Sequence, residues 1–581
     1  MSVSLVKADS LLAIDVGTIN TRVSLFDVVD ARYRYLGSGV APTTINAPFN
    51  DINEGINQAI ESLQVITGRV LLTEEAQLIT PEKVDGSGVD LVAATISAYA
   101  PVKVIVSGLL EDISTESAFR LARSISSIIL ERFGLNDHLT SQERLNSIIQ
   151  SQPDLVIVAG GSERGAENAV LKIIDTVGLA CYLLPENHQP KVLFVGNSQL
   201  SEKLKQTPLI GQTIRIAPNI HPTIDVEQLQ PAQGELIEVF RSIQTREIGG
   251  FSLLDTWTKG TTIPASFGWE RVVRLLSTIY DSQKGVLGVD VSTSGICLAA
   301  GFGGETRLAV YPEFGLIHPF NNLNINEIKK WLIHDLSSTE IQDRLQNRAL
   351  YPAAIPMTAE DLDLEQANAV VQLQNSLQQF LPQISSIAKT KEPDWLPGVE
   401  PIIVSGSIFT NSNNLAQTGL TILNGVQPTG ITTLVLDQHH LIKVLGAVAA
   451  VNPVLAIQAM DFGTLLNLAS VITPLGHAKP GTLILKAKIN YADGREQKLD
   501  VRYGQLICLL LAPGQAMEMH LQPFHKFDIG MGGEGVGGKV RLNGSALGVI
   551  IDARGRPLHF PQDMNKRREL NQRWLLTLEK R

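Results

Sequence analysis

The residues best suited to chemistry form a turn near the start of the chain. The turn lies between two apolar segments and comprises Asp15, Gly17, Thr18, Asn20 and Thr21. A glycine exposes backbone N–H groups to a phosphate, hydroxyl and amide side chains donate hydrogen bonds to its oxygens, and a carboxylate can hold magnesium through water. We therefore predict a phosphate and magnesium site, with a purely structural hairpin as the alternative.

A second turn of the same plan occurs about half a chain later. Residues 11–28 and 286–303 each combine an apolar strand, an aspartate at its end, a turn of small polar residues and a second apolar strand. The second turn carries Asp290, Ser292, Thr293 and Ser294. Its hydroxyls suit a phosphate, and a structural turn is an equal alternative. The spacing far exceeds the period of a solenoid or propeller, so it predicts a two-lobed duplication.

A third candidate site follows the apolar strand PIIVS and consists of Ser405, Gly406 and Ser407. A glycine directly after a strand lets a flat purine or ribose lie against the backbone, because no Cβ blocks the approach. Strand-to-glycine turns are common, so this feature by itself is weak evidence for a site.

Parallel strands and crossover helices are expected to position these turns. Apolar, β-branched segments at 154–161 and 191–197 end in glycine or asparagine and are followed by helical patterns. Apolar strands that end in this way and are followed by helices are typical of α/β architecture. Thr140 and Glu143 have the spacing of a capping box that starts a helix. We expect the α/β pattern to extend to about residue 460.

The chain changes character after residue 465, where β-rich segments alternate with turn signals and predict a small all-β unit. The stretch from Gly530 to Gly538 is dense in glycine and is interpreted as a mobile loop or hinge rather than an anion site. The expected domains are a first lobe with an inserted α/β segment (1–284), a second lobe (285–464) and a β-rich C-terminal extension (465–581).

Composition excludes several classes of protein. Of the 581 residues, 44% are hydrophobic and 18% are charged, which allows large buried cores and excludes a mainly disordered chain. The net charge is −10 and no dense basic stripe stands out, so nucleic acid is not expected as a partner. The sequence has no GxSxG elbow, HExxH pair or P-loop, so the corresponding hydrolases, metalloproteases and NTPases lack support.

Cysteines and apolar segments point to a cytoplasmic protein. Cys181, Cys297 and Cys508 are odd in number, far apart and set in apolar segments, which favours buried thiols in a reducing compartment. The N-terminal residues lack the basic and cleavage regions of a signal peptide. The most apolar segment, 444–460, is interrupted by an asparagine and a proline and is shorter than a membrane span. We expect no membrane association.

The order of the three turns resembles that of the actin, Hsp70 and sugar-kinase superfamily. Within it, the chain looks like the MutL-type proteins associated with glutamate mutase, which share only a name with the mismatch-repair protein. The resemblance spans about residues 10–460. It rests on long segments that recur in order, among them IDVGTINTRVSLFDV, DLVIVAGGSERGAENAV, RIAPNIHPTIDVEQLQPAQGELIEVF and DQHHLIKVLGAVAAVNP.

The resemblance implies a fold, a cofactor and a partner. The fold would be α/β, a duplicated actin/Hsp70-like (ribonuclease H-like) structure whose two lobes close on ATP or ADP with magnesium. The first turn would be one phosphate loop, Asp290 to Ser294 the second, and Ser405 to Ser407 the adenosine turn, with Asp15 and Asp290 holding magnesium through water. The implied role is a chaperone or reactivating factor for an adenosylcobalamin-dependent mutase.

Two departures from the family pattern concern the second turn. Relatives carry a pair of glycines where this chain has Ser292 and Thr293, and an aspartate where it has Cys297. Added Cβ atoms hinder backbone contact with phosphate, and a lost carboxylate removes a candidate metal ligand. A weak ATPase is the most that this turn suggests.

Three functions remain, in order of preference. The first is an ATP-binding protein that passes a conformational change to a protein partner. The second is a scaffold that kept the fold and works without nucleotide. The third is a sugar-kinase-like phosphotransferase, for which no carboxylate base can be assigned.

Overall fold

The structure is a computed structural model that describes residues 9–163, 165–206, 213–280, 283–317, 324–390, 395–461, 463–524 and 526–579. The chain divides into two compact units. Unit 1 comprises Met1–Gly268, Leu308–Pro312 and Ala447–Leu455, and unit 2 comprises Trp269–Arg307, Glu313–Gly446 and Ala456–Arg581. Within the described ranges, no helix combines the length and the apolar character needed to cross a membrane.

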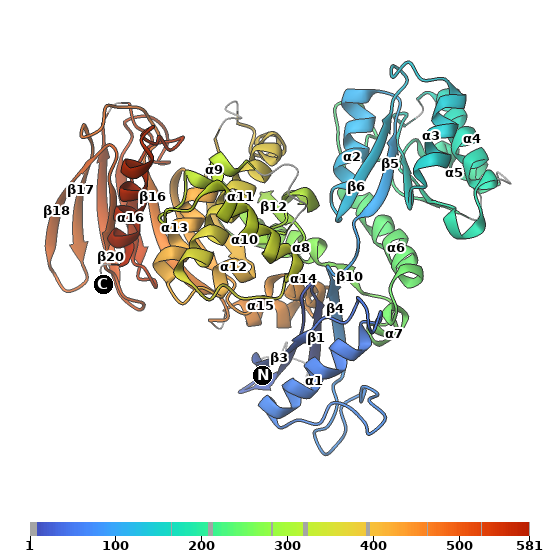
Figure 1. The fold of residues 1–581 in the computed structure, drawn as a ribbon, viewed down its shortest axis with the longest axis horizontal. Helices are drawn as coiled ribbons and strands as arrows, with labels where there is room; N and C mark the ends of the chain where they lie inside the picture. Colours follow the sequence, from blue (N-terminus) through green and yellow to red (C-terminus); the bar gives the residue numbers. More distant parts are fainter. Residues whose placement is uncertain are drawn as a thin grey trace, which may run out of the picture. The chain divides into compact units, whose positions relative to one another are not determined.

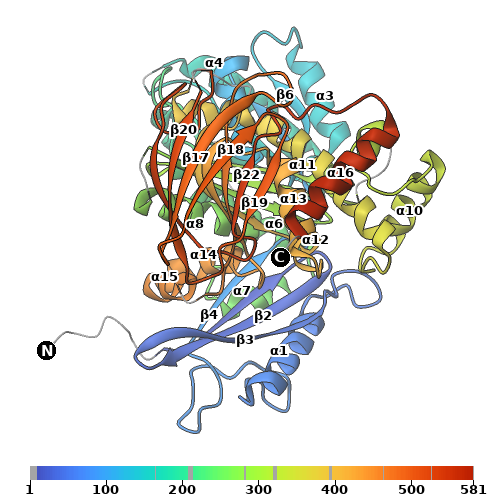
Figure 2. The ribbon, with the colours of Figure 1, turned by 90° about the vertical axis from the view of Figure 1, so that its left-hand side faces the viewer.

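Unit 1 contains a five-stranded sheet that carries the first turn (Figure 1). Its strands, in spatial order, are β10 (Ile263–Pro264), β4 (Leu91–Ile96), β1 (Leu11–Val16), β2 (Asn20–Val29) and β3 (Arg32–Pro42). β1 is antiparallel to β2 and parallel to β4, and β10 is parallel to β4. Every residue of β1 is buried, as in a central strand covered on both faces. Helix α1 (Asn53–Thr67) packs against β2 and β3 (Figure 2).

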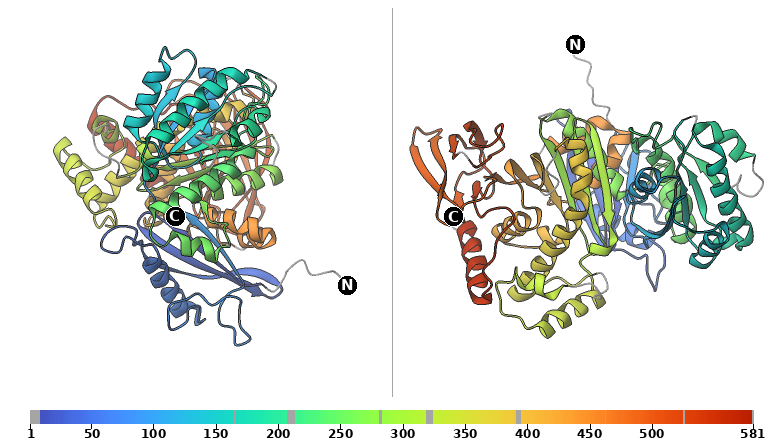
Figure 3. Two further views of the ribbon diagram at one scale, coloured as in Figure 1. Left: turned by 90° about the vertical axis from the view of Figure 1, so that its right-hand side faces the viewer. Right: turned by 90° about the horizontal axis from the view of Figure 1, so that it is seen from above.

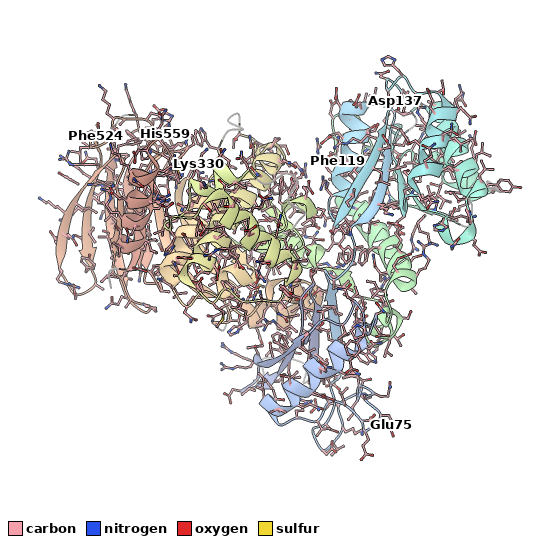
Figure 4. The ribbon with its side chains drawn as sticks, viewed as in Figure 1. Glu75, Phe119, Asp137, Lys330, Phe524 and His559 are labelled. Carbon is pink, nitrogen blue, oxygen red and sulfur yellow. The ribbon has the colours of Figure 1, made fainter. Side chains whose placement is uncertain are left out.

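A second sheet of unit 1 lies between β4 and β10 in the sequence, and its strands all run parallel. In spatial order they are β6 (Ser127–Phe133), β5 (Val102–Ser107), β7 (Leu155–Val158), β8 (Lys191–Phe194) and β9 (Ile214–Ile216). Its helices, visible in Figure 3, are α2 (Glu116–Ala122), α3 (Ser141–Ser151), α4 (Glu167–Leu183) and α5 (Ser201–Lys205). The expected capping box of Thr140 and Glu143 is present at the start of α3. Asp137, labelled in Figure 4, binds Arg144 of α3 at 2.7 Å.

Most of an eight-stranded sheet belongs to unit 2, and the first strands of this sheet repeat the plan of the five-stranded sheet in unit 1. In spatial order they are β13 (Glu305–Tyr311), β12 (Ile296–Phe302), β11 (Gly285–Val291), β14 (Val399–Ser405) and β15 (Gly430–Leu436). β11 is antiparallel to β12 and parallel to β14, and β14 is parallel to β15. The order and these directions match β3, β2, β1, β4 and β10. The expected fold class, a duplicated actin/Hsp70-like α/β fold, is confirmed.

The strands after residue 465 are shared between two sheets. β16 (Leu466–Thr473), β22 (Val549–Asp552) and β19 (Leu506–Leu509) continue the eight-stranded sheet beyond β15. β18 (Glu496–Arg502), β17 (Leu483–Tyr491), β20 (Ala516–Pro523) and β21 (Gly538–Asn543) form a separate antiparallel sheet. One apolar core, including Ile472, Leu485 and Met519, joins the two sheets. The β-rich C-terminal region is therefore present, and the domain boundaries given above remain predictions.

The remaining helices connect or cover these sheets. They are α6 (Gln230–Glu247), α7 (Phe251–Trp257), α8 (Ala265–Ile279), α9 (Ile325–Lys329), α10 (Ser338–Leu350), α11 (Ala359–Ala388), α12 (Ser407–Thr410), α13 (Leu415–Val426), α14 (Ile442–Val451), α15 (Pro453–Asp461) and α16 (Met564–Glu579). The C-terminal helix α16 packs against α13 and β19, which fastens the end of the described chain to unit 2.

Candidate functional site

The two aspartate turns have the same backbone geometry. In unit 1, Val16 pairs with Thr21, and the N–H of Gly17 donates to the carbonyl of Asn20 at 3.1 Å. In unit 2, Val291 pairs with Ile296, and the N–H of Ser292 donates to the carbonyl of Gly295 at 3.0 Å. Both turns therefore span four residues closed by the same hydrogen bond, and Ser292 occupies the position of Gly17.

The segment that follows the third strand holds the carbonyl oxygens of each turn. In unit 1, Thr43 donates its hydroxyl to the Gly17 carbonyl at 2.6 Å and its N–H to the Ile19 carbonyl at 2.9 Å. In unit 2, the N–H groups of Leu316 and Ile317 donate to the carbonyls of Ser292 and Thr293, each at 3.2 Å. The turn carbonyls are thus satisfied by protein, an arrangement that favours a ligand that accepts hydrogen bonds.

Asp15 lies buried at the end of β1, where the hydroxyl of Thr95 on β4 donates to its carboxylate at 2.9 Å. The neighbouring β4 strand thus orients the carboxylate. Thr18 is half-buried and Asn20 is exposed, so a hydroxyl and an amide stand at the tip of the turn. Both groups can bind a phosphate oxygen, so the tip of the first turn fits a phosphate.

Thr21 differs from the other predicted ligands of the first turn. It is completely buried, and its hydroxyl lies 2.9 Å from the hydroxyl of Thr43. Because Thr43 donates to the carbonyl of Gly17, its oxygen is the acceptor and Thr21 is the donor. The Thr21 side chain is therefore hydrogen-bonded to Thr43, in the segment that follows β3.

In the second turn, Asp290 and Ser294 are half-buried and Thr293 is buried. The hydroxyl of Ser292 donates back to the carbonyl of Gly295 at 2.7 Å. This hydroxyl reinforces the turn from within, a role that Gly17 cannot play in the first turn.

The third turn lies beside the second in unit 2. β11 and β14 are parallel neighbours, and Asp290 pairs directly with Ser405. Gly406 has a φ of +127°, and a Cβ there would lie 2.1 Å from the carbonyl oxygen of Val291. The structure thus brings Asp290 to Ser294 and Ser405 to Ser407 together at one sheet edge, while the first turn belongs to unit 1.

Sequence reasoning missed two residues at this edge. Asp437 directly follows β15, is completely buried, and accepts the N–H groups of Leu441 and Ile442 at 2.9 and 3.0 Å. His440 contacts the hydroxyl of Ser405 through Nδ1 at 3.2 Å and that of Thr410 through Nε2 at 3.1 Å. The sequence contains the same signal for Asp437 as for the other turns, because Asp437 also comes at the end of an apolar strand.

Negative charge is concentrated at this edge of unit 2. The pKa of Asp437 is raised to about 6, mainly by burial and also by the charge of Asp290, although the two N–H donors and Lys443 act in the opposite direction. Burial and the charge of Asp290 also raise the pKa of the Cys297 thiol well above its usual range. A bound cation would relieve this repulsion, which fits the expected use of magnesium near Asp290. In the described part of the chain, no cluster of three or more His, Cys, Asp and Glu side chains could hold a metal directly.

A family model described as MutL protein matches residues 11–462. The chain belongs to this MutL family. The family resemblance found in the sequence is therefore confirmed. The MutL match ends at residue 462, so the β-rich region that starts at residue 465 lies outside it. No curated protein matches the chain in sequence.

Several solved structures are similar to this MutL-family chain at low sequence identity. An acetone carboxylase in a nucleotide-free structure is 10% identical, covers 86% of this chain and 82% of its own, and has a TM-score of 0.30. A diol dehydratase-reactivating factor in nucleotide-free form is 9% identical, with coverage of 77% and 100% and a TM-score of 0.29. An acetate kinase from Entamoeba histolytica is 10% identical, with coverage of 76% and 99% and a TM-score of 0.24.

Proposed function

We propose that this MutL-family protein binds ATP or ADP with magnesium through its aspartate turns and passes the resulting conformational change to a protein partner. The observation that carries the proposal is the repetition of one turn, closed by one hydrogen bond, at the same point of two sheets of the same order. A turn of any sequence could connect the strands in each copy of the duplicated plan. An aspartate at the end of the first strand in both copies therefore points to shared chemistry.

Each turn has a distinct role in this proposal. Thr18 and Asn20 would bind phosphate oxygens in unit 1, and Thr293 and Ser294 would do so in unit 2. Asp15 in the first turn and Asp290 in the second are the proposed magnesium-binding carboxylates, each acting through water. Ser405, Gly406 and Ser407 would contact adenosine, while the missing Cβ of Gly406 makes room for the Val291 carbonyl oxygen, which lies 2.1 Å from where that Cβ would stand.

The partner is proposed from the family. MutL-type proteins are associated with glutamate mutase, so an adenosylcobalamin-dependent mutase is the proposed client, and reactivation of that enzyme is the proposed purpose. The cysteines Cys181, Cys297 and Cys508 are free thiols, which accords with a reducing cytoplasm. Hydrolysis would be slow, since Ser292 and Thr293 replace glycines of the family pattern.

Calorimetric titration of the full chain with ATP and ADP, with and without magnesium, tests the proposal. We expect saturable binding that magnesium strengthens, and about tenfold weaker binding for Asp290→Asn, since hydrogen bonds and ion contacts to charged groups have this magnitude. Asp493→Asn is the matched control, because Asp493 is an exposed carboxylate of the same unit and, among the residues described, its side chain binds Arg495 alone. Absence of binding to either nucleotide would overturn the proposal.

A nucleotide-independent scaffold is the second candidate, and the second turn favours it. Ser292 uses its hydroxyl within the turn, and Thr293 is 94% buried. A scaffold would capture its protein partner equally well as wild type and as the double variant Asp15→Asn, Asp290→Asn. Loss of partner capture in the double variant would instead favour the nucleotide-dependent function.

A further inference from the structure

Unit 2 contains a cavity of about 230 Å³ to which the proposed function gives no role. Its walls are the eight-stranded sheet on one side and β21 with the residues that follow it on the other. The polar residues that line it include Glu400, Thr433, Asn467, Ser470, Arg541 and Asn543. None of these residues belongs to the three candidate turns.

Strand register gathers several of these side chains on one face of the sheet. Thr433 pairs with Ser470 across β15 and β16, and Val435 pairs with Asn467. Leu468 is an extra residue between these pairs, so β16 has a β-bulge at this point. The bulge brings Asn467 to the face that carries Ser470, which regular alternation would prevent.

A second irregularity occurs where β14 enters the cavity wall. Gly285 pairs with Val399 and Leu287 with Ile402, so the stretch that contains Glu400 has one residue more than its partner strand. β-bulges are common beside binding sites because they redirect side chains. Two bulged strands that border one cavity indicate that its lining is specifically arranged.

The charges of the cavity leave one cation without a partner. Glu400 forms an ion pair with Lys284 and accepts a hydrogen bond from the hydroxyl of Thr433 at 3.2 Å. Within the described ranges, the guanidinium of Arg541 has no ion pair or hydrogen bond. Glu518 lies opposite Arg541 on β20 but binds Lys539 at 3.3 Å. Arg541 is exposed, so its positive charge is open to an anion that enters the cavity from solvent.

Its neutral polar groups are also unused by the protein. The side chains of Asn467, Ser470 and Asn543 make no hydrogen bonds to other described residues, and Asn467 and Asn543 are exposed, so these groups are open to a ligand that enters from solvent. Amide and hydroxyl groups pair with the hydroxyls of a polyol, since both can donate and accept.

The volume limits the size of the ligand. A water molecule takes about 30 Å³ of liquid, so the cavity holds about seven or eight waters. Sites for drug-sized ligands start at about 300 Å³, so the space matches a single sugar ring, and a nucleotide would extend beyond it.

We propose that this cavity binds a monosaccharide-sized polyol that carries one carboxylate or phosphate group. Arg541 binds the anionic group, and Asn467, Ser470 and Asn543 bind the hydroxyls. The site is separate from the nucleotide turns, so a ligand can bind there whether or not the chain binds ATP.

Calorimetric titration of the full chain with glucuronate, glucose 6-phosphate, glucose and inorganic phosphate tests this proposal. We expect saturable binding of glucuronate or glucose 6-phosphate, and the comparison between them identifies the anionic group. Glucose and inorganic phosphate should bind at least about tenfold more weakly, because each offers only part of the interactions. Failure of both sugar anions to bind would overturn the proposal, as would equal binding of inorganic phosphate.

Variants separate this site from general charge effects. Arg541→Gln and Ser470→Ala should each weaken binding by about tenfold. Lys498→Gln should not change it, because Lys498 is an exposed basic residue on β18, at the opposite edge of the same sheet from β21. Equal weakening by Lys498→Gln would contradict the assignment of Arg541. Asp290→Asn should leave sugar binding intact, so failure of this site and failure of the nucleotide proposal give different results. Thermal melting checks that each variant is folded.

Discussion

Gly406 lies directly against Val291: a Cβ on Gly406 would be 2.1 Å from the Val291 carbonyl oxygen, and the φ of Gly406 is +127°. Val291 is the last residue before the second turn, and Gly406 is the centre of the third. Contact between the two backbones therefore links the candidate phosphate turn to the candidate adenosine turn through a position that only glycine can occupy.

Gly406→Ala should destabilise unit 2 by about 2 kcal/mol or more, because the side chain meets backbone and the φ is strained for any other residue. Thermal unfolding measures the loss. Gly398→Ala is the matched control, since it lies just before the same strand, its φ is not positive, and a Cβ there meets nothing within 4 Å. A Gly406→Ala protein as stable as Gly398→Ala would contradict the close approach.

Thr95→Val should destabilise unit 1 by about 1–3 kcal/mol, because the buried Asp15 carboxylate loses a hydrogen-bond donor. It should also weaken nucleotide binding if Asp15 acts in the first turn. Thr432→Val provides the comparison, since the Thr432 hydroxyl is buried without a hydrogen-bond partner in the described structure. We expect this control to be neutral or slightly stabilising, and urea unfolding distinguishes the two variants.

Asp437 should make unit 2 less stable as the pH rises from 5 to about 7.5. Its pKa is raised from 3.8 to about 6 in the folded state, so folding favours the protonated form. The resulting stabilisation is full below the unfolded pKa and is lost as the pH rises through about 6, which amounts to roughly 1 kcal/mol over this range. Asp437→Asn should remove this pH dependence. Calorimetric melting at both pH values tests the prediction, with Asp493→Asn as a control that should titrate like wild type.

Asp552→Asn should destabilise the C-terminal part of unit 2 strongly. Arg554 and Arg556 are buried and both donate to the Asp552 carboxylate at 2.8 Å. These cations hold the pKa of Asp552 well below its usual range despite its burial. Neutralising the shared anion leaves two buried guanidinium groups, which costs about 3–5 kcal/mol.

Hydrogen exchange should show the effect of Asp552→Asn first in β22 and α16. Arg554 stacks on Trp574 of α16 at 4.5 Å from the ring centroid, so the helix depends on the same cluster. The exposed pair of Asp493 and Arg495 is the control, and its loss should cost less than about 1 kcal/mol. Equal effects of the two substitutions would contradict the role of the buried cluster.

The three turns were predictable because each is a local pattern. An apolar strand followed by Asp, Gly, Ser or Thr is read from consecutive residues, and the repetition of Asp15 and Asp290 identified the duplication. The place of Asp437 beside this site was not predictable, because β15 joins β14 only after 24 intervening residues of helix and loop. Pairing between such strands is decided by burial and not by local sequence.

The C-terminal strands illustrate the same limit. Their alternation predicted a β-rich region, but not that β16, β19 and β22 would extend the second sheet while β17, β18, β20 and β21 form another. A strand pattern defines two faces, and the choice of neighbour depends on apolar surfaces distant in sequence. The core that includes Ile472 and Met519 makes that choice.

By itself, the sequence determined the MutL family, the duplicated α/β plan and the identity of the turn residues. Only the tertiary structure decided which of these residues face a ligand and which face the core. In the folded protein, Thr21 is buried against Thr43, the Ser292 hydroxyl donates to the Gly295 carbonyl, and Asp437 lies near Asp290. The reason is physical: residue types establish what a group can donate or accept, whereas packing between distant segments establishes which partner it meets.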